Sequence, residues 1–157
     1  MKQVLITGIT GTLGTALSGL LLARGVRVLG ISRDEQKQRQ MPRDELLVLR
    51  LAEVRDPAAV ERAVGRAEID TVFHLAALKC VDTLEFHPYE AYMTNVIGTQ
   101  NMVDLADHIG ARLVLTSTDK ACYPVNTYGY TKALAEKIVL AAGQSVVRYG
   151  NVMGSRG

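Results

Sequence analysis

Residues 7–14 read TGITGTLG and directly follow the aliphatic run QVLIT at residues 3–7. Three glycines, Gly8, Gly11 and Gly14, recur here at intervals of three. In a strand–turn–helix unit, the first glycine permits a tight turn, the second admits a pyrophosphate, and the third lets the helix pack closely. The N-terminus of that helix then offers N–H groups and a positive dipole end to the anion. Glycines also occur where they only make turns, but the flanking strand and helix favour a phosphate site.

The rest of the chain alternates between strand-like and helix-like stretches. Aliphatic runs predict strands buried on both faces, at about residues 3–7, 26–31, 46–50, 70–75, 112–116 and 144–149. Helices are predicted at about residues 12–24, 57–67, 88–109 and 127–142. Pro57 and Pro88 suit first helical turns, Asp56 suits an N-cap, and residues 33–45 suit a loop with one helical turn. The alternation predicts an α/β fold, a Rossmann-type doubly wound parallel sheet of about six strands in the order 3-2-1-4-5-6, with no substantial second domain.

Composition limits the class of protein. The chain has 157 residues, of which 48% are apolar, so one domain over residues 1–157 is expected. Its 18 basic and 16 acidic residues are mixed along the chain, which favours neither nucleic acid nor a membrane surface as a partner. Cys80 and Cys122 fit no metal spacing, so we expect no metal site and a reducing cytoplasm. The start MKQVLITG lacks a signal-peptide pattern, and Arg24 and Arg27 interrupt the longest apolar runs, so no transmembrane helix is expected.

The end of the second strand bears on the choice of dinucleotide. An acidic residue there holds the ribose 2′-hydroxyl of NAD, whereas a basic residue accommodates the 2′-phosphate of NADP. The sequence SRDEQK at residues 32–37 supplies both Arg33 and Asp34, with Lys37 nearby. We therefore expect NADP, with NAD as the alternative. Arg33 and Lys37 could equally be ordinary solvated loop charges.

Chemically active side chains gather in residues 116–132, TSTDKACYPVNTYGYTK. Tyr128 and Lys132 are four residues apart at the start of a predicted helix, so they share one face. A nearby ammonium is expected to lower the pKa of the tyrosine, which could then exchange a proton with a sugar hydroxyl while hydride moves to nicotinamide. Asp119 and Lys120 follow the fifth strand, at the sheet edge where such folds bind ligands. A loop ion pair or helix cap is the structural alternative for these two.

These motifs resemble the extended short-chain dehydrogenase/reductase family. Within it, the chain is most similar to inverting UDP-N-acetylglucosamine 4,6-dehydratases. The matching stretches are TGITGTLG (7–14), SRDEQK (32–37), HLAALKCVD (74–82), TNVIGTQN (94–101), STDKACYPVNTYGYTK (117–132) and VRYGNVMGSRG (147–157). The Asp-Lys pair discriminates best, because the family's ordinary epimerases lack it and its glucose-type dehydratases have Asp-Glu.

The resemblance implies an NADP-dependent hydro-lyase that makes a 4-keto-6-deoxy sugar from UDP-N-acetylglucosamine. In that family pattern Tyr128 takes the proton of the sugar 4-hydroxyl, Lys120 is the base at C5, and Asp119 protonates the departing 6-hydroxyl. Lys132 supports the tyrosine and holds the ribose, and Thr118 binds the 4-oxygen. The resemblance also implies cofactor contacts from Gly8, Thr10, Gly11, Thr12, Leu13, Gly14, Ser32, Arg33, Asp34, Lys37, Glu53, Val54, Leu75, Ala76, Ala77, Lys79, Asn95, Thr116, Tyr128, Lys132, Tyr149 and Asn151.

A few positions carry a second interpretation. Glu53 stands where the family usually has Asp beside the adenine. Asn95 could support the active-site helix or be purely structural, and Lys79 could reach the cleft or be solvated. His74 is expected in the core rather than in catalysis.

Length is the main departure, because family members are about twice as long and their second half forms most of the nucleotide-sugar pocket. The family's C-terminal substrate domain is therefore expected to be absent. A non-catalytic NADP-binding module and the N-terminal fragment of a split or truncated dehydratase are the alternatives to a compact enzyme. We expect a homodimer or higher homo-oligomer through the apolar faces of the helices at 88–109 and 127–142, which include Val96, Val103, Leu134 and Ile138.

Overall fold

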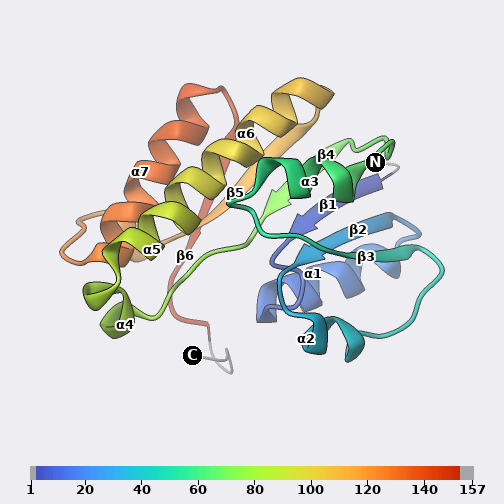
Figure 1. The fold of residues 1–157 in the computed structure, drawn as a ribbon, viewed down its shortest axis with the longest axis horizontal. Coiled ribbons are helices and arrows are strands. Elements are labelled where there is room, and N and C mark those ends of the chain that lie inside the picture. Colours follow the sequence, from blue (N-terminus) through green and yellow to red (C-terminus); the bar gives the residue numbers. More distant parts are fainter. Residues whose placement is uncertain (1–2, 153–157) are drawn as a thin grey trace.

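A computed structural model of the chain describes residues 3–152, which form a doubly wound α/β domain (Figure 1). Residues 1–2, and residues 153–157 at the end of the family stretch 147–157, lie outside the described residues. The strands are β1 (Gln3–Thr7), β2 (Arg27–Ser32), β3 (Leu47–Leu51), β4 (Thr71–His74), β5 (Arg112–Thr118) and β6 (Ser145–Tyr149). They pair in parallel in one sheet of order β3-β2-β1-β4-β5-β6, which confirms the predicted fold class and strand order.

Helices cover both faces of the sheet (Figure 1). They are α1 (Thr12–Leu22), α2 (Glu35–Arg39), α3 (Pro57–Val64), α4 (Val81–Phe86), α5 (Pro88–Tyr92), α6 (Gly98–Ile109) and α7 (Thr127–Ala141). The larger core packs α3, α6 and α7 on one face through residues such as Val60, Met102, Val139, Leu5, Val72 and Leu115. The smaller core packs α1 on the other face through Leu21, Ile9, Val4, Ile6 and Val28.

Local sequence signals explain where several helices begin and end. The side chains of Asp34, Asp56 and Asn126 accept backbone hydrogen bonds at the N-termini of α2, α3 and α7. Asp56 is thus the N-cap that the sequence predicts, and the single helical turn expected within residues 33–45 is α2. Helix α3 ends at Val64, before the predicted residue 67, because Gly65 adopts a positive φ of 57°.

The predicted helix at 88–109 is interrupted. Helix α5 passes into a π-helical turn, Met93–Ile97, before α6 continues to Ile109. Such turns insert one residue into the ladder and often mark functional sites. Helix α4 was not predicted, and among residues 3–152 no helix is long and apolar enough to cross a membrane.

The prediction that every strand is buried on both faces is wrong for β3 and β6. Most of their residues are exposed or half-buried, whereas β1 and β2 are almost wholly buried. The physical reason is position, since β3 and β6 are the two edges of the sheet and each has a neighbour on one side only. The inner strands, by contrast, have the continuous apolar character of a covered parallel sheet.

Candidate active site

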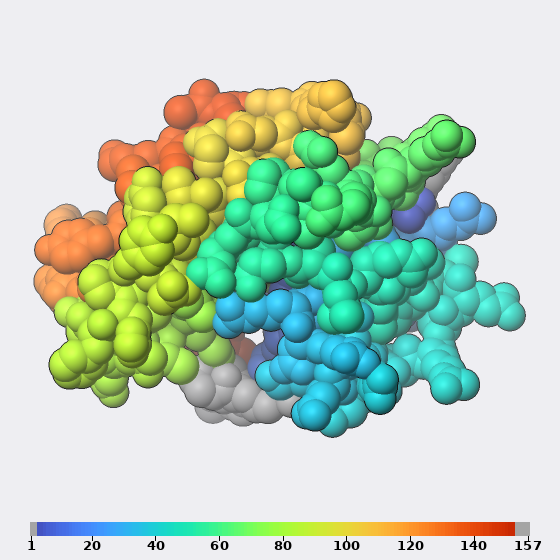
Figure 2. Space-filling view, in the orientation of Figure 1, coloured from blue at the N-terminus to red at the C-terminus, as the bar shows by residue number. Residues whose placement is uncertain are grey.

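A cleft of about 980 Å³ opens at the carboxyl ends of the strands. In Figure 2 a hollow is visible between the blue N-terminal part of the chain and the yellow-green segment around α4. Most predicted site residues line this cleft: Gly8, Thr10, Gly11, Thr12, Leu13, Gly14, Ser32, Arg33, Asp34, Lys37, Glu53, Val54, Leu75, Ala76, Ala77, Lys79, Thr116, Thr118, Lys120, Tyr128, Lys132, Tyr149 and Asn151. Two predicted residues, Asn95 and Asp119, do not line it.

The glycine turn is shaped for close approach of a ligand. Gly8 has a φ of +65°, and a Cβ there would lie 2.9 Å from the Ala76 backbone. A Cβ on Gly14 would lie 2.6 Å from the carbonyl oxygen of Gly8, so any larger residue would push α1 away from the turn. Within the described residues, α1 has no side chain capping its N-terminus at Gly11, unlike α2, α3 and α7. This N-terminus lines the cleft, as a phosphate site requires.

A second feature also fits a polar ligand. The hydroxyl of Thr94, in the π-helical turn, is buried and has no hydrogen-bond partner among residues 3–152, although the residue lines the cleft. Buried polar groups are normally paired, so an orphan hydroxyl on a cleft wall favours a ligand that pairs with it. The cleft as built therefore fits a dinucleotide, with phosphates at the glycine turn.

The end of β2 carries mixed charge. Both carboxylate oxygens of Asp34 are engaged by Lys37: Oδ1 accepts from its backbone nitrogen at 2.9 Å, and Oδ2 lies 2.6 Å from Nζ. These hydrogen bonds lower the pKa of Asp34. Arg33 makes only a long contact, 3.5 Å, to Glu53, and its side chain is 55% exposed. Arg33 is thus the charged group here that can turn toward a ligand most easily.

The Asp-Lys pair lies where β5 ends. Strand β5 runs two residues further than predicted and includes Thr118, whose hydroxyl donates to Asp119 Oδ1 at 2.9 Å. Lys120 Nζ donates to the same oxygen at 3.2 Å and to Asn151 Oδ1 at 3.4 Å. The hydrogen bond from Thr118, then that from Lys120, lowers the pKa of Asp119. The pair is therefore an ion pair at the mouth of the cleft.

Tyr128 and Lys132 lie on the cleft face of α7, but not with the electrostatics that the sequence predicts. Lys132 is only 2% exposed, and its Nζ donates to the carbonyl oxygen of Thr116 at 2.8 Å. Burial lowers the pKa of Lys132 to about 8, and the carboxylate of Glu136 acts in the opposite direction. The pKa of Tyr128 is raised, because burial outweighs its hydrogen bond with Thr118. The expected lowering by Lys132 is thus wrong in this structure, since the ammonium is directed at a backbone carbonyl.

A directed hydrogen-bond chain lies beneath the cleft. Thr7 Oγ1 accepts from the backbone nitrogens of Leu75 and Ala76, both at 3.1 Å, so its proton must go to His74 Nδ1 at 2.7 Å. The imidazole is therefore neutral with its proton on Nε2, which donates to Thr99 Oγ1 at 3.1 Å. Thr99 in turn donates to the carbonyl oxygen of Asn95 at 2.7 Å. Burial, aided by the charge on Lys132, lowers the pKa of His74 to about 3. His74 is a core histidine, as predicted.

Asn95 belongs to this support rather than to the cleft. Its side chain binds the backbone of Leu78 twice, accepting from the nitrogen at 2.8 Å and donating to the oxygen at 3.0 Å. It also donates to Thr131 Oγ1 at 3.1 Å. The prediction of a cofactor contact from Asn95 is therefore not borne out by its position, because its amide is used to join the loop after β4 to α7.

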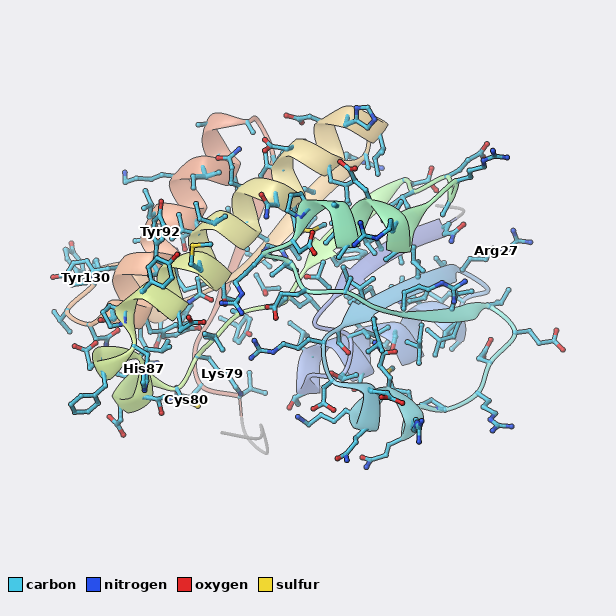
Figure 3. All side chains as sticks on the ribbon, viewed as in Figure 1. Arg27, Lys79, Cys80, His87, Tyr92 and Tyr130 are labelled. Carbon is cyan, nitrogen blue, oxygen red and sulfur yellow. The ribbon has the colours of Figure 1, made fainter. Side chains whose placement is uncertain are left out.

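Several lining residues were not predicted: Ala16, Ile31, Ala52, Cys80, Val81, Thr94, Gly150 and Val152. Lys79 and Cys80 project from the loop between β4 and α4 (Figure 3). Thr94 directly precedes Asn95, which is the one signal that could have drawn attention to it.

The arrangement brings a phenol and two amines to a cleft that also contains the glycine turn, with the carboxylate of Asp119 beside one of the amines. Such a set can move protons at neighbouring carbons of one substrate while a redox cofactor lies alongside.

The chain matches the family "Polysaccharide biosynthesis protein" over residues 4–157. In an alignment of 174 positions it is 39% identical to the UDP-glucose 4-epimerase of Rickettsia rickettsii, covering 99% of this chain and 50% of that protein. Among solved structures, Pen from Bacillus thuringiensis is 38% identical with a TM-score of 0.92, covering 99% of this chain and 52% of Pen. The Bordetella bronchiseptica enzyme WbmG, solved with NAD and UDP, is 28% identical with a TM-score of 0.80, covering 92% of this chain and 51% of WbmG.

The chain spans about half the length of the curated relatives it matches. The family match extends over almost every residue, and the relatives and solved neighbours include nucleotide-sugar epimerases and dehydratases. The chain therefore belongs to the polysaccharide biosynthesis protein family of extended short-chain dehydrogenases/reductases, and corresponds to the N-terminal half of its relatives.

Proposed function

We propose that this chain forms the cofactor-binding and catalytic part of an NADP-dependent nucleotide-sugar 4,6-dehydratase acting on UDP-N-acetylglucosamine. One observation carries the proposal: the Asp119–Lys120 pair lies at the carboxyl end of β5, and Lys120 lines the same cleft as Tyr128 and Lys132. A simple dehydrogenase or epimerase needs no additional acid and base beside the tyrosine. The UDP and NAD held by WbmG support the ligand class.

The residues that would hold NADP are those of the glycine turn and the end of β2. The chemistry that the bound cofactor would supply is the acceptance of a hydride from C4 of the sugar and its return to C6. Arg33 supports NADP over NAD, because its long contact to Glu53 can be exchanged for a charge-assisted bond to a 2′-phosphate. Asp34 is committed to Lys37 and to capping α2, so it is a poor partner for a ribose hydroxyl.

Each proton transfer has a group in the cleft or directly beside it. Tyr128 takes the proton of the 4-hydroxyl, and the ketone formed at C4 makes the C5 proton acidic. Lys120 Nζ takes the C5 proton, and Asp119 donates a proton to the 6-hydroxyl, which leaves as water. The Lys120 ammonium then returns a proton to C5 as hydride is added at C6. Thr118 is hydrogen-bonded to both Tyr128 and Asp119. It therefore connects the group proposed for oxidation at C4 with the group proposed for loss of the 6-hydroxyl.

The ion pair must change its protonation before it can act in these roles. A base has to be a neutral amine and an acid a protonated carboxyl, which requires one proton to move from Lys120 Nζ to Asp119 Oδ1 across 3.2 Å. In water a lysine holds its proton far more tightly than an aspartic acid does, but removal of water favours the two neutral forms. The side chains are 36% and 57% exposed, so a bound sugar or further polypeptide must cover them for catalysis.

A nucleotide-sugar 4-epimerase is the second candidate. The relatives at 39% identity favour it, since the Rickettsia rickettsii protein is a UDP-glucose 4-epimerase. That reaction would use Tyr128 and Lys132 but give no role to Lys120 as a base. In either case the nucleotide end of the sugar is expected to be held by a second chain or by sequence equivalent to the other half of the relatives.

Incubation of the protein with UDP-N-acetylglucosamine and a trace of NADP+, followed by NMR of the sugar, tests the proposal. A 4-keto-6-deoxy product supports the dehydratase. The C4 epimer of UDP-N-acetylglucosamine, or of UDP-glucose supplied in a parallel incubation, supports the second candidate. Binding of NADP without either product would contradict catalysis by this chain alone and favour a non-catalytic or incomplete module.

A further inference from the structure

Glu136 is a buried carboxylate that the proposed reaction does not use. It lies on α7 four residues after Lys132 and eight after Tyr128, so the three side chains share one face of the helix. Glu136 is 4% exposed and Lys132 is 2% exposed. Carboxylates are almost never buried to this degree without a partner, so Glu136 must be paired within the fold.

Arg148 of β6 fixes the position of this carboxylate. Its Nε donates to Glu136 Oε1 at 2.8 Å and its Nη2 donates to Oε2, which is the paired geometry of an arginine fork. Its Nη1 also contacts Cys122 Sγ at 3.2 Å, two residues after Lys120. A single guanidinium thereby links β6, α7 and the segment that follows the Asp-Lys pair.

The charge on Glu136 bears on Lys132. The lysine donates to a neutral carbonyl, that of Thr116, and lies near the neutral imidazole of His74 on β4. The phenol of Tyr128 on α7 lines the same cleft. Of the groups around it on α7, β4, β5 and β6, Glu136 is the one whose negative charge favours the ammonium form, and the positive charge of Arg148 behind it offsets part of that effect. Burial works against that form, so the neighbouring carboxylate decides how much of the lysine is charged near neutral pH.

We infer that Glu136, held in place by Arg148, is a positioning residue that keeps Lys132 charged at the pH where the enzyme works. The inference rests on the proposed function, in which the Lys132 ammonium holds the ribose and supports Tyr128. The charge state of a lysine can be measured without substrate. The inference can therefore fail while the proposed function stands, and the proposed function can fail while the inference stands.

The test is an NMR titration of isotope-labelled lysine side chains, with the Lys132 signal assigned by its loss in Lys132→Arg. Glu136→Gln keeps the size of the side chain and removes its charge. It should lower the Lys132 pKa by about one unit and move the high-pH limit of NADP binding down by a similar amount. Glu90→Gln is the control, since Glu90 also forms an ion pair with an arginine, Arg55, but through one contact and on α5. It should leave Lys132 unchanged.

A purely structural role for Glu136 predicts a different result. In that case Glu136→Gln would lower the melting temperature while the Lys132 titration stayed where it was, and the inference would be overturned. If Glu136→Gln does not fold, the double variant Glu136→Met with Arg148→Met removes both charges and leaves none unpaired, a replacement that buried ion pairs often tolerate. The Lys132 titration should still be lowered, but by less than in Glu136→Gln, because the repulsion from Arg148 is lost as well. An unchanged titration in this variant would mean that the ion pair as a whole does not keep Lys132 charged, and would also overturn the inference.

Discussion

Acid should destabilise this protein through His74, well above the pH at which its carboxylates titrate. The pKa of His74 is about 3 in the folded protein, against an ordinary 6.5 in the unfolded chain. Between these values the unfolded chain binds a proton that the folded protein does not, so acid favours unfolding. The stability is fully present above pH 6.5 and is lost as the pH falls toward 3.

The size of the effect follows from these two values. Well below pH 6.5, each fall of one pH unit lowers the free energy of unfolding by about 1.36 kcal/mol. Allowing for partial protonation near 6.5, the free energy of unfolding should fall by about 2 kcal/mol between pH 7.5 and pH 5.0. Asp34, Asp119 and Glu136 also have lowered pKa values, but their stability is lost only as the pH falls below their ordinary values of 3.8 to 4.5. Their contribution therefore lies below this window.

Urea unfolding at a series of pH values measures the effect, followed by circular dichroism because the chain has no tryptophan. His74→Asn should be less stable at pH 7.5, since it loses part of the chain from Thr7 to Thr99, but its stability should vary little down to pH 5.0. His108→Asn, which changes an exposed histidine, should keep the slope of the parent. Equal stability of the parent at pH 7.5 and 5.0, or a slope that persists in His74→Asn, would refute the reasoning.

The remaining predictions concern the proposed function. Arg33→Ala should weaken NADP binding by about 1.5–3 kcal/mol and NAD binding much less, by calorimetry; equal affinity of the parent for both cofactors would contradict the role of Arg33. Lys120→Ala and Asp119→Asn should each slow dehydration on the order of 10²–10⁴-fold, and full activity in both would remove their assigned roles. Reduced cofactor should not accumulate during turnover, since the hydride returns to the sugar; steady accumulation in the absorbance of reduced nicotinamide would indicate a simple dehydrogenase. Sedimentation should show at least two associated chains, with Tyr130→Glu on the outer surface of α7 (Figure 3) favouring the monomer, and a parent that is already monomeric would contradict the dimer.

The arrangement of the sheet could be read from the sequence because its determinants are local. Each buried strand has its own aliphatic run, and right-handed crossovers leave few ways to order such runs. The burial of each strand could not be read in the same way. Leu51 is 54% exposed and Val147 is 48% exposed, although both lie in runs as apolar as those of β1. Burial depends on the position of a strand within the sheet, because an edge strand has a neighbouring strand on one side only.

The cleft was predicted where a motif marks it and missed where tertiary contacts form it. The glycine turn and the stretch after β5 carry recognisable residue types, and these line the cleft. Thr94 and Cys80 come instead from the π-helical turn and an unpredicted loop. The apolar pattern of a helix does not distinguish α-helical hydrogen bonds, four residues apart, from π-helical ones, five residues apart. The periodicity of the sequence therefore does not reveal the π-helical turn that brings Thr94 to the cleft wall and Asn95 to Leu78.

Protonation is the property least accessible from the sequence. The spacing of Tyr128 and Lys132 places both on one helix face, yet it does not say where the ammonium is directed. In the structure Lys132 reaches Thr116 rather than the phenol, and burial acts on the two groups in opposite senses, lowering the lysine pKa and raising that of the tyrosine. Both shifts favour uncharged side chains, whereas the proposed chemistry needs an ammonium beside a tyrosine that can lose its proton. The carboxylate of Glu136 already opposes the lowering of the Lys132 pKa from within the fold. The charge state of Lys132 is therefore the measurement that most directly links this architecture to catalysis.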